Sequence, residues 1–244
     1  MAKFEKGDWV QKGKRRGIVC GKNGRQLVVR WLGRDRGERV GAKALKSAPT
    51  PWVLGMEGSL DSDLTSTRSA EKVLRTWLGA ENVQAAYKTV HCLEDVRIIG
   101  RAIGPVPPLL VYISCHGNHD GKRPYLTLGP STRKSDHVYL DDDETVEVFG
   151  EAFPGMHILL SACNLGKYGQ PIGQFRRKAG LGKIAVYTRG IYDSESMLFD
   201  LMVFHGMLSK HWTFTTAIER AVVAMNAIGV KGGTGRGQKF VKVF

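Results

Sequence analysis

The chain has 244 residues, of which 42% are hydrophobic and 24% charged, and its formal net charge is +13. These are ordinary values for a globular protein with a sizeable core. No apolar run is long enough to cross a bilayer, and the first residues lack the apolar core of a signal peptide. We therefore expect a cytoplasmic protein with no membrane partner.

Cysteine spacing and charge distribution narrow the expectation further. The cysteines at positions 20, 92, 115 and 163 match neither a zinc ribbon nor a disulfide framework, so they are predicted to be free thiols. Residues 1–48 contain fourteen basic and four acidic residues, a net charge of +10, which leaves +3 for the rest. This asymmetry indicates that the two parts of the chain meet different partners.

The first 48 residues contain short segments typical of β-strands, at 8–10, 17–20, 27–31 and near 39–40. Asn23-Gly24 predicts a hairpin between the second and third. Strands this short must pair several at a time to be stable. The pattern KGDWV…RGIV…NGRQLVVRWLG resembles SH3-like or Tudor-like barrels, so we expect a small β-barrel at 1–48. Residues 49–51, with two prolines, are a predicted linker to a second domain at 52–244.

From residue 52 onward, predicted strands and helices alternate. Apolar runs predict strands at 52–56, 83–90, 109–113, 157–160, 184–188 and 239–244. Helical spacing of apolar residues predicts helices at 66–78, 93–103, 144–153, 194–209 and 214–227, and 124–141 is typical of a hairpin or edge strand. This order predicts an α/β fold with a mostly parallel sheet and helices on both faces.

Two of these strands run into reactive side chains. Residues 109–113 lead to Cys115-His116-Gly117, and residues 157–160 lead to Ser161-Ala162-Cys163. Ligands of open α/β sheets bind at the carboxyl ends of strands, so His116 and Cys163 would meet if the strands are neighbours. A thiol and an imidazole in reach of each other suit nucleophilic catalysis. Cys115 is the rival nucleophile, but it directly precedes His116 and should point away from it, which favours a structural role.

The segments LLVYISCHG and HILLSACNLG resemble the His-Gly and Ala-Cys elements of caspase-like cysteine peptidases, a superfamily that includes metacaspases, separases and CHAT-domain proteases. The resemblance covers residues 52–244. In animal caspases a glutamine stands two positions before the cysteine, where this chain has Ser161, and this difference favours a bacterial-type member.

The resemblance implies roles for individual residues. Cys163 would attack the scissile carbonyl, His116 would protonate the leaving amine, and the backbone N–H groups of Gly117 and Cys163 would form the oxyanion hole. No metal or organic cofactor is implied. The substrate pocket would involve Ser161 and the segment after the strand at 184–188, where Arg189 suits an acidic substrate residue and Asp193 a basic one. Ser161 in place of glutamine favours the basic preference, although Asp193 could equally be a helix N-cap.

Two charged regions remain open to more than one interpretation. The basic residues of the N-terminal domain, together with Trp9 and Trp31, suit a nucleic-acid backbone and stacked bases, or else the tryptophans fill the barrel core. An acidic protein, or the chain's own catalytic domain, is the other candidate partner. The candidate nucleic-acid ligands are Arg15, Arg16, Arg30, Arg34 and Arg36. The acidic run 141–144 is either a surface loop at a helix N-terminus or a calcium site.

The sequence therefore predicts a cysteine endopeptidase that uses a His-Cys dyad and is regulated or targeted by its basic N-terminal domain. The family resemblance suggests a role in bacterial defence or cell death. The alternative is a nucleic-acid-binding adaptor whose α/β domain is a scaffold without turnover.

Overall fold

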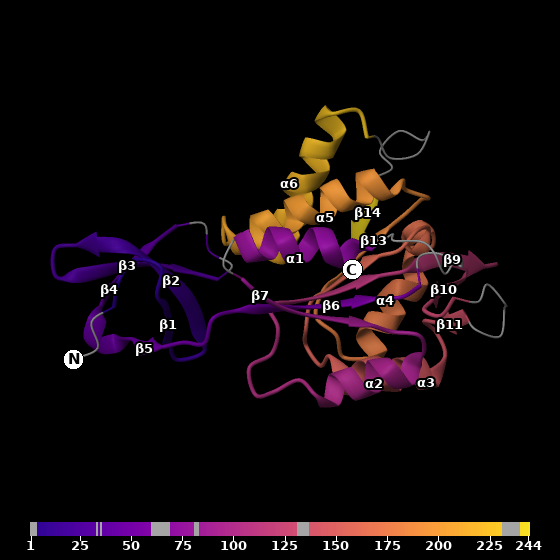
Figure 1. Cartoon of the computed structure of the whole chain (residues 1–244), viewed down its shortest axis with the longest axis horizontal. Coiled ribbons are helices and arrows are strands. Elements are labelled where there is room, and N and C mark those ends of the chain that lie inside the picture. The colour runs from indigo at the N-terminus through magenta and orange to yellow at the C-terminus, as the bar shows by residue number, and fades with distance from the viewer. Residues whose placement is uncertain are drawn as a thin grey trace.

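The computed structural model describes residues 4–32, 34, 36–59, 69–80, 83–130, 137–230 and 240–244. In these residues the chain forms three β-sheets and six α-helices (Figure 1). None of the helices in these ranges is both long and apolar enough to span a membrane.

The N-terminal sheet is antiparallel and has the strand order β4-β3-β2-β1-β5. The predicted hairpin joins β2 to β3, and it closes where Asn23 pairs with Gln26, so Gly24 (φ +60°) lies inside the turn. Alternate side chains of these strands fill a small separate core that includes Trp31. The strands are β1 (Trp9–Lys12), β2 (Arg15–Asn23), β3 (Gln26–Trp31), β4 (Glu38–Gly41) and β5 (Lys46–Ser47).

The second sheet has six strands in the order β14-β13-β12-β8-β6-β7. Every neighbouring pair is parallel except β13 and β14, so the prediction of a mostly parallel sheet is confirmed. The strands are β6 (Trp52–Glu57), β7 (Gln84–Thr89), β8 (Leu110–Ser114), β12 (Ile158–Ser161), β13 (Ile184–Tyr187) and β14 (Val241–Val243).

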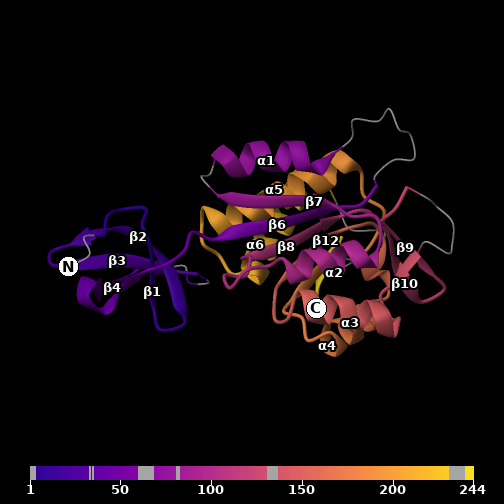
Figure 2. The ribbon, with the colours of Figure 1, turned by 60° about the horizontal axis from the view of Figure 1, so that its bottom comes forward.

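Helices cover both faces of this sheet (Figures 1 and 2). One face packs on α1 (Ala70–Ala80), α5 (Asp193–Leu208) and α6 (Phe214–Ala227). The other packs on α2 (Leu93–Arg101), α3 (Asp143–Ala152) and α4 (Gly169–Lys178). The helix predicted at 66–78 begins at Ala70, and residues 66–68 lie outside the described ranges. The sequence did not predict α4, because two glycines and a proline interrupt its short apolar pattern.

A third, antiparallel sheet follows β8 and consists of β9 (His116–Asp120), β10 (Arg123–Thr127) and β11 (His137–Tyr139). The sequence predicted a loop where β9 lies, because its residues are polar throughout. β9 is a strand because β10 pairs with it along its whole length. The sequence predicted that His116 and Cys163 lie in adjacent loops at the sheet edge, and for His116 this is wrong, since it is the first residue of a paired strand.

Candidate active site

His116 and Cys163 lie at the carboxyl ends of two adjacent parallel strands. β8 and β12 pair in register, with Ser114 opposite Ser161 at their last residues. His116 and Cys163 each come two residues after one of these serines, so the register brings their backbones to the same edge of the sheet. His116 is exposed and Cys163 is half-buried.

The backbone at Gly117 packs directly on the segment that carries Cys163. A Cβ atom at position 117 would lie 2.8 Å from the Ala162 Cβ and 2.9 Å from the Cys163 carbonyl oxygen. Such approaches are too close for any side chain, so only glycine fits. The turn after the thiol is sharp, because Asn164 has a left-handed conformation with φ +61°. Its backbone N–H donates a hydrogen bond of 3.1 Å to the Arg189 carbonyl oxygen.

A cavity of about 280 Å³ joins these residues, and both His116 and Cys163 line it. Ser161 and Asp193 also line it, as the sequence predicted for a substrate pocket. Asp193 is the first residue of α5 and not its N-cap, which is Tyr192, so the capping alternative is wrong.

Arg189 is not among the residues that line this cavity. Its guanidinium lies 3.5 Å from a carboxylate oxygen of Glu195 and donates to the Gly190 carbonyl oxygen at 2.8 Å. The geometry therefore brings the predicted acidic residue to the pocket and holds the predicted basic residue outside it.

The two cysteines near the sheet edge differ in their surroundings. Cys115 is buried, and burial raises the pKa of its thiol to about 12. A thiol with this pKa carries almost no thiolate near neutral pH and is a poor nucleophile. The Cys163 sulfur accepts a hydrogen bond of 3.5 Å from the Ile191 backbone N–H. Both cysteines line the cavity, but Cys115 is buried and Cys163 is half-exposed, which makes Cys163 the better candidate nucleophile.

Asp200 is a functional candidate that the sequence argument missed. It lies on α5, is fully buried, and accepts hydrogen bonds from three hydroxyls: Ser161 at 2.6 Å, Tyr187 at 2.8 Å and Tyr112 at 3.0 Å. All three donors line the cavity, so the carboxyl group lies directly beneath its floor. Burial raises the pKa of Asp200 to about 7, although the three hydrogen bonds act in the opposite direction.

A sequence signal for Asp200 was present. Residues 197–208 are otherwise almost entirely apolar, and a carboxylate inside such a run must either be neutral or find partners. The sequence could not name those partners, because Tyr112, Ser161 and Tyr187 come from three different strands.

In the N-terminal sheet, one of the candidate nucleic-acid ligands, Arg15, pairs with side chains of the protein. The Arg15 guanidinium lies 2.6 Å from Glu38 and 4.4 Å above the ring of Trp31. Trp31 is buried and donates to Glu38 at 2.8 Å, so it fills the core and offers no face to a base. Arg30 is half-buried, and its Nε atom is enclosed without a hydrogen-bond partner. Arg34 and Arg36 are exposed, and Arg16 is half-buried.

Trp9 contacts the α/β part of the chain. Its ring lies 5.9 Å from the ring of His211, which stands between α5 and α6 in a left-handed conformation with φ +56°. Burial, and then the charge of Arg30, lower the pKa of His211 to about 4. Trp9 lies on the face of the N-terminal sheet opposite its core. This face therefore contacts the C-terminal end of α5, which is the end farther from the cavity.

The acidic run after β11 pairs with an arginine. Arg123 donates to Asp141 at 2.8 Å and to Asp142 at 2.6 Å, and its guanidinium lies 4.2 Å above the ring of Tyr139. Asp142 is the N-cap residue of α3, and Asp143 begins the helix. The interpretation as a surface loop with helix N-terminal charge is confirmed, and two of the four carboxylates in the proposed calcium site, those of Asp141 and Asp142, pair with Arg123.

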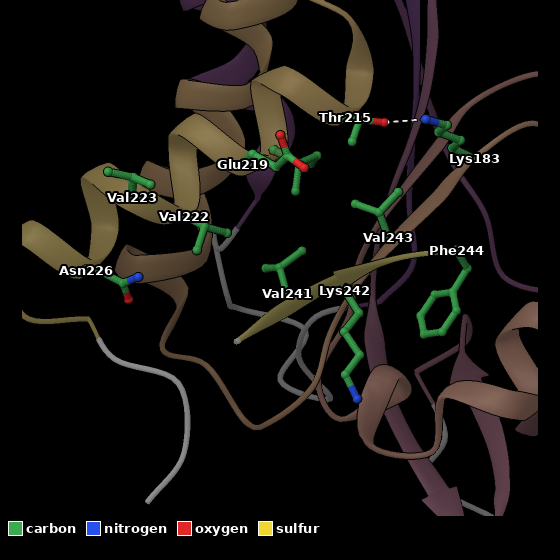
Figure 3. Close-up of a pocket in the computed structure, with 11 residues that line it drawn as sticks. Lys183, Thr215, Glu219, Val222, Val223, Asn226, Val241, Lys242, Val243 and Phe244 are labelled. Carbon is green, nitrogen blue, oxygen red and sulfur yellow. Dashed lines mark hydrogen bonds between the residues drawn. The ribbon is translucent and has the colours of Figure 1, made fainter. Parts of the chain in front are cut away.

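A larger groove of about 590 Å³ lies elsewhere, between α6 and the edge strand β14 (Figure 3). Four of its eleven lining residues are valines, namely Val222, Val223, Val241 and Val243. Lys183 donates to Thr215 at 2.6 Å across its mouth. Since no cysteine or histidine lines this groove, we assign the candidate active site to the smaller cavity.

No protein-family model matches the sequence, and no curated protein matches it significantly.

Proposed function

We propose that the chain is a cysteine endopeptidase of the caspase-like type, in which Cys163 is the nucleophile and His116 the general acid. The observation that carries the proposal is the close packing of Gly117 on Ala162 and Cys163, at the mouth of one cavity. Nucleophilic catalysis requires a thiol and a base within reach of each other, and the adjoining backbone of His116 and Cys163 supports this. A caspase-like arrangement of the large sheet and an SH3-like arrangement of the N-terminal sheet belong to the same proposal.

In this mechanism the Cys163 thiolate attacks the scissile carbonyl carbon, and the C–N bond breaks as the departing amine takes a proton from the His116 imidazolium. The acyl group remains on sulfur as a thioester. Water then attacks the thioester carbonyl carbon and gives a proton to His116. The C–S bond breaks, so the acid product leaves and the thiolate is restored. The backbone N–H groups of Gly117 and Cys163 are the proposed oxyanion donors, each worth roughly 100-fold or more in rate.

The floor of the cavity suits a basic substrate residue. When Asp200 is ionised, it is a buried carboxylate whose hydrogen-bond donors are all neutral hydroxyls. A nearby cation would stabilise the negative charge of such a group more than any neutral partner does. A lysine or arginine side chain at the cleaved position would bring that cation to Ser161 and the two tyrosines. Asp193 adds negative charge at the wall, whereas Arg189 is held by Glu195. Cleavage after basic residues is therefore the proposed specificity.

The N-terminal sheet is proposed to direct the peptidase to nucleic acid through phosphate contacts. Support comes from the many basic side chains that are exposed there: Lys12, Lys14, Arg15, Lys22, Arg25, Arg34, Arg36, Arg39, Lys43 and Lys46. Base stacking is no longer part of the proposal, since Trp31 lies in the core and Trp9 lies against His211.

The test compares wild type with Cys163→Ala on a peptide mixture that covers every residue type at the cleaved position. We expect cleavage after Arg or Lys by wild type only, with unchanged thermal unfolding of the variant. Cys92→Ala, at an exposed cysteine away from the cavity, is the control and should cleave normally. Cleavage after Asp or Glu would indicate that Arg189, and not Asp193 or Asp200, binds the substrate side chain at the cleaved position. No cleavage, with or without added DNA and RNA, would favour the adaptor alternative.

A further inference from the structure

Helix α5 is apolar on the side that faces away from the sheet as well as on the side that faces it. Its inner side chains, such as Phe199 and Val203, are fully buried against the sheet. Outward-turned Leu198 is 39% exposed, and Leu201 and Met202 are half-buried. A surface helix normally carries polar residues on its outer side. Leu201 and Met202 pack partly on the core, and the surface that they and Leu198 leave exposed is an apolar stripe.

Helix α1 runs beside α5 on the same face of the sheet and carries matching apolar residues (Figures 1 and 2). Val73 is 43% exposed, and Trp77 packs its ring 6.4 Å from Phe204 and 6.3 Å from His205. A groove of about 380 Å³ is lined by residues of α1, α5 and α6. Its walls are formed by Trp77, Leu201, Met202, His205, Trp212, Arg220, Ala221 and Ala224.

This groove begins about one helical turn away from the candidate active site. Val73 and Met197 line the catalytic cavity, and Trp77 and Leu201, each four residues further along the same helix, line the groove. Four residues of helix advance by about 6 Å, which an extended peptide spans in about two residues. A chain whose basic side chain occupies the cavity can therefore place a neighbouring side chain in the groove.

We propose that this groove between α1, α5 and α6 is a second specificity site that binds a large apolar side chain of the protein substrate, about two to four residues from the cleaved position. The inference rests on the proposed peptidase function. The occupant is a substrate segment because the groove begins about one helical turn from the cavity where the substrate is proposed to lie. Met202 in its wall is flexible and can adapt to aliphatic or aromatic side chains. His205 and Arg220 at its far end disfavour a second basic residue there.

The test uses two peptides with the same basic cleaved residue, one with leucine or phenylalanine at the neighbouring positions and one with serine. We expect wild type to prefer the apolar peptide by about 10-fold or more in kcat/KM, as burial of one large apolar side chain predicts. Leu201→Lys should abolish the preference and leave kcat/KM unchanged for a reporter that carries only the basic residue. Val223→Lys is the matched control, since Val223 is 68% exposed and lies in the other groove (Figure 3).

Binding to the inactive Cys163→Ala protein, followed by the fluorescence of Trp77 and Trp212, keeps the two proposals separate. One outcome is that wild type cleaves neither peptide, while Leu201→Lys weakens binding of the apolar peptide by about 10-fold. In that case the groove is supported and the peptidase proposal fails. Equal use of both peptides by an active wild type overturns the groove. A wild-type dimer that Leu201→Lys dissociates, measured by sedimentation, also overturns it, because a second copy would then be the occupant.

Discussion

Replacing Asp200 by asparagine should make the protein more stable and less active at the same time. Asparagine keeps the shape of a protonated carboxyl group and can still hydrogen-bond the hydroxyls of Ser161, Tyr112 and Tyr187, but it cannot ionise. The folded-state pKa of Asp200 is about 7, above the ordinary value of 3.8, so folding favours the protonated form. The stability associated with that proton is complete below pH 4 and is lost as pH rises to 7.

The size of the effect follows from the same pKa. Raising a carboxyl pKa from 3.8 to about 7 corresponds to roughly 4 kcal/mol, an order-of-magnitude value for a fully buried group. Asp200→Asn should recover much of this, so its free energy of unfolding should exceed that of wild type by about 2–4 kcal/mol at pH 8. The difference should shrink steadily below pH 7 and vanish near pH 4.

Activity should change in the opposite direction. Without a carboxylate beneath the cavity, cleavage after Arg or Lys should fall by about 100-fold or more in kcat/KM at pH 8, since a buried charge would lose its partner. In wild type, ionisation of Asp200 should raise kcat/KM as pH increases through about 7, and the variant should lack this increase. Urea unfolding and peptide cleavage at pH 5 and pH 8 measure both effects.

Asp193→Asn is the matched control, because this carboxyl group lines the same cavity but is exposed. It should change stability by less than about 0.5 kcal/mol. A variant Asp200→Asn that is less stable than wild type at pH 8, or that still cleaves basic peptides at the wild-type rate, would refute the reasoning.

Three further predictions concern the dyad and the N-terminal sheet. Gly117→Ala should fold but lose most of its cleavage activity, because the new methyl group would displace the Ala162–Cys163 backbone; normal turnover would show that the close approach is unimportant. Cys115→Ser should lower the free energy of unfolding by about 1–3 kcal/mol through a buried hydroxyl yet retain cleavage, whereas an inactive but stable variant would make Cys115 the nucleophile. The double variant Arg34→Ala, Arg36→Ala should weaken DNA or RNA binding and reduce its salt slope by about 2, measured by fluorescence anisotropy; an unchanged slope would assign the basic surface to another partner.

Local patterns in the sequence were sufficient for much of the fold. The apolar runs at 109–113 and 157–160 are buried on both sides and became β8 and β12. Helices α5 and α6 begin and end within a residue of their predicted bounds. Because strands of this kind carry their reactive residues at the carboxyl end, His116 and Cys163 could be named as a pair before their neighbours were known.

Other features depend on partners that are distant in the sequence. β9 is polar along its length and is a strand because β10 lies beside it, and α4 buries only Ile172 and Phe175 against the sheet. The sequence left Trp31 open to base stacking or to the barrel core, and the structure shows it buried in the core with Glu38 hydrogen-bonded to both Trp31 and Arg15.

Asp200 illustrates the limit most clearly. The sequence by itself determined that a carboxyl group stands in an apolar helix, and that a histidine and a cysteine follow two buried strands. Only the tertiary structure decided that the helix packs over Tyr112, Ser161 and Tyr187, beneath the cavity that the dyad lines. The physical reason is that hydrophobic periodicity is read over a few residues, whereas strand order and helix packing, which decide which side chains meet, depend on the whole chain.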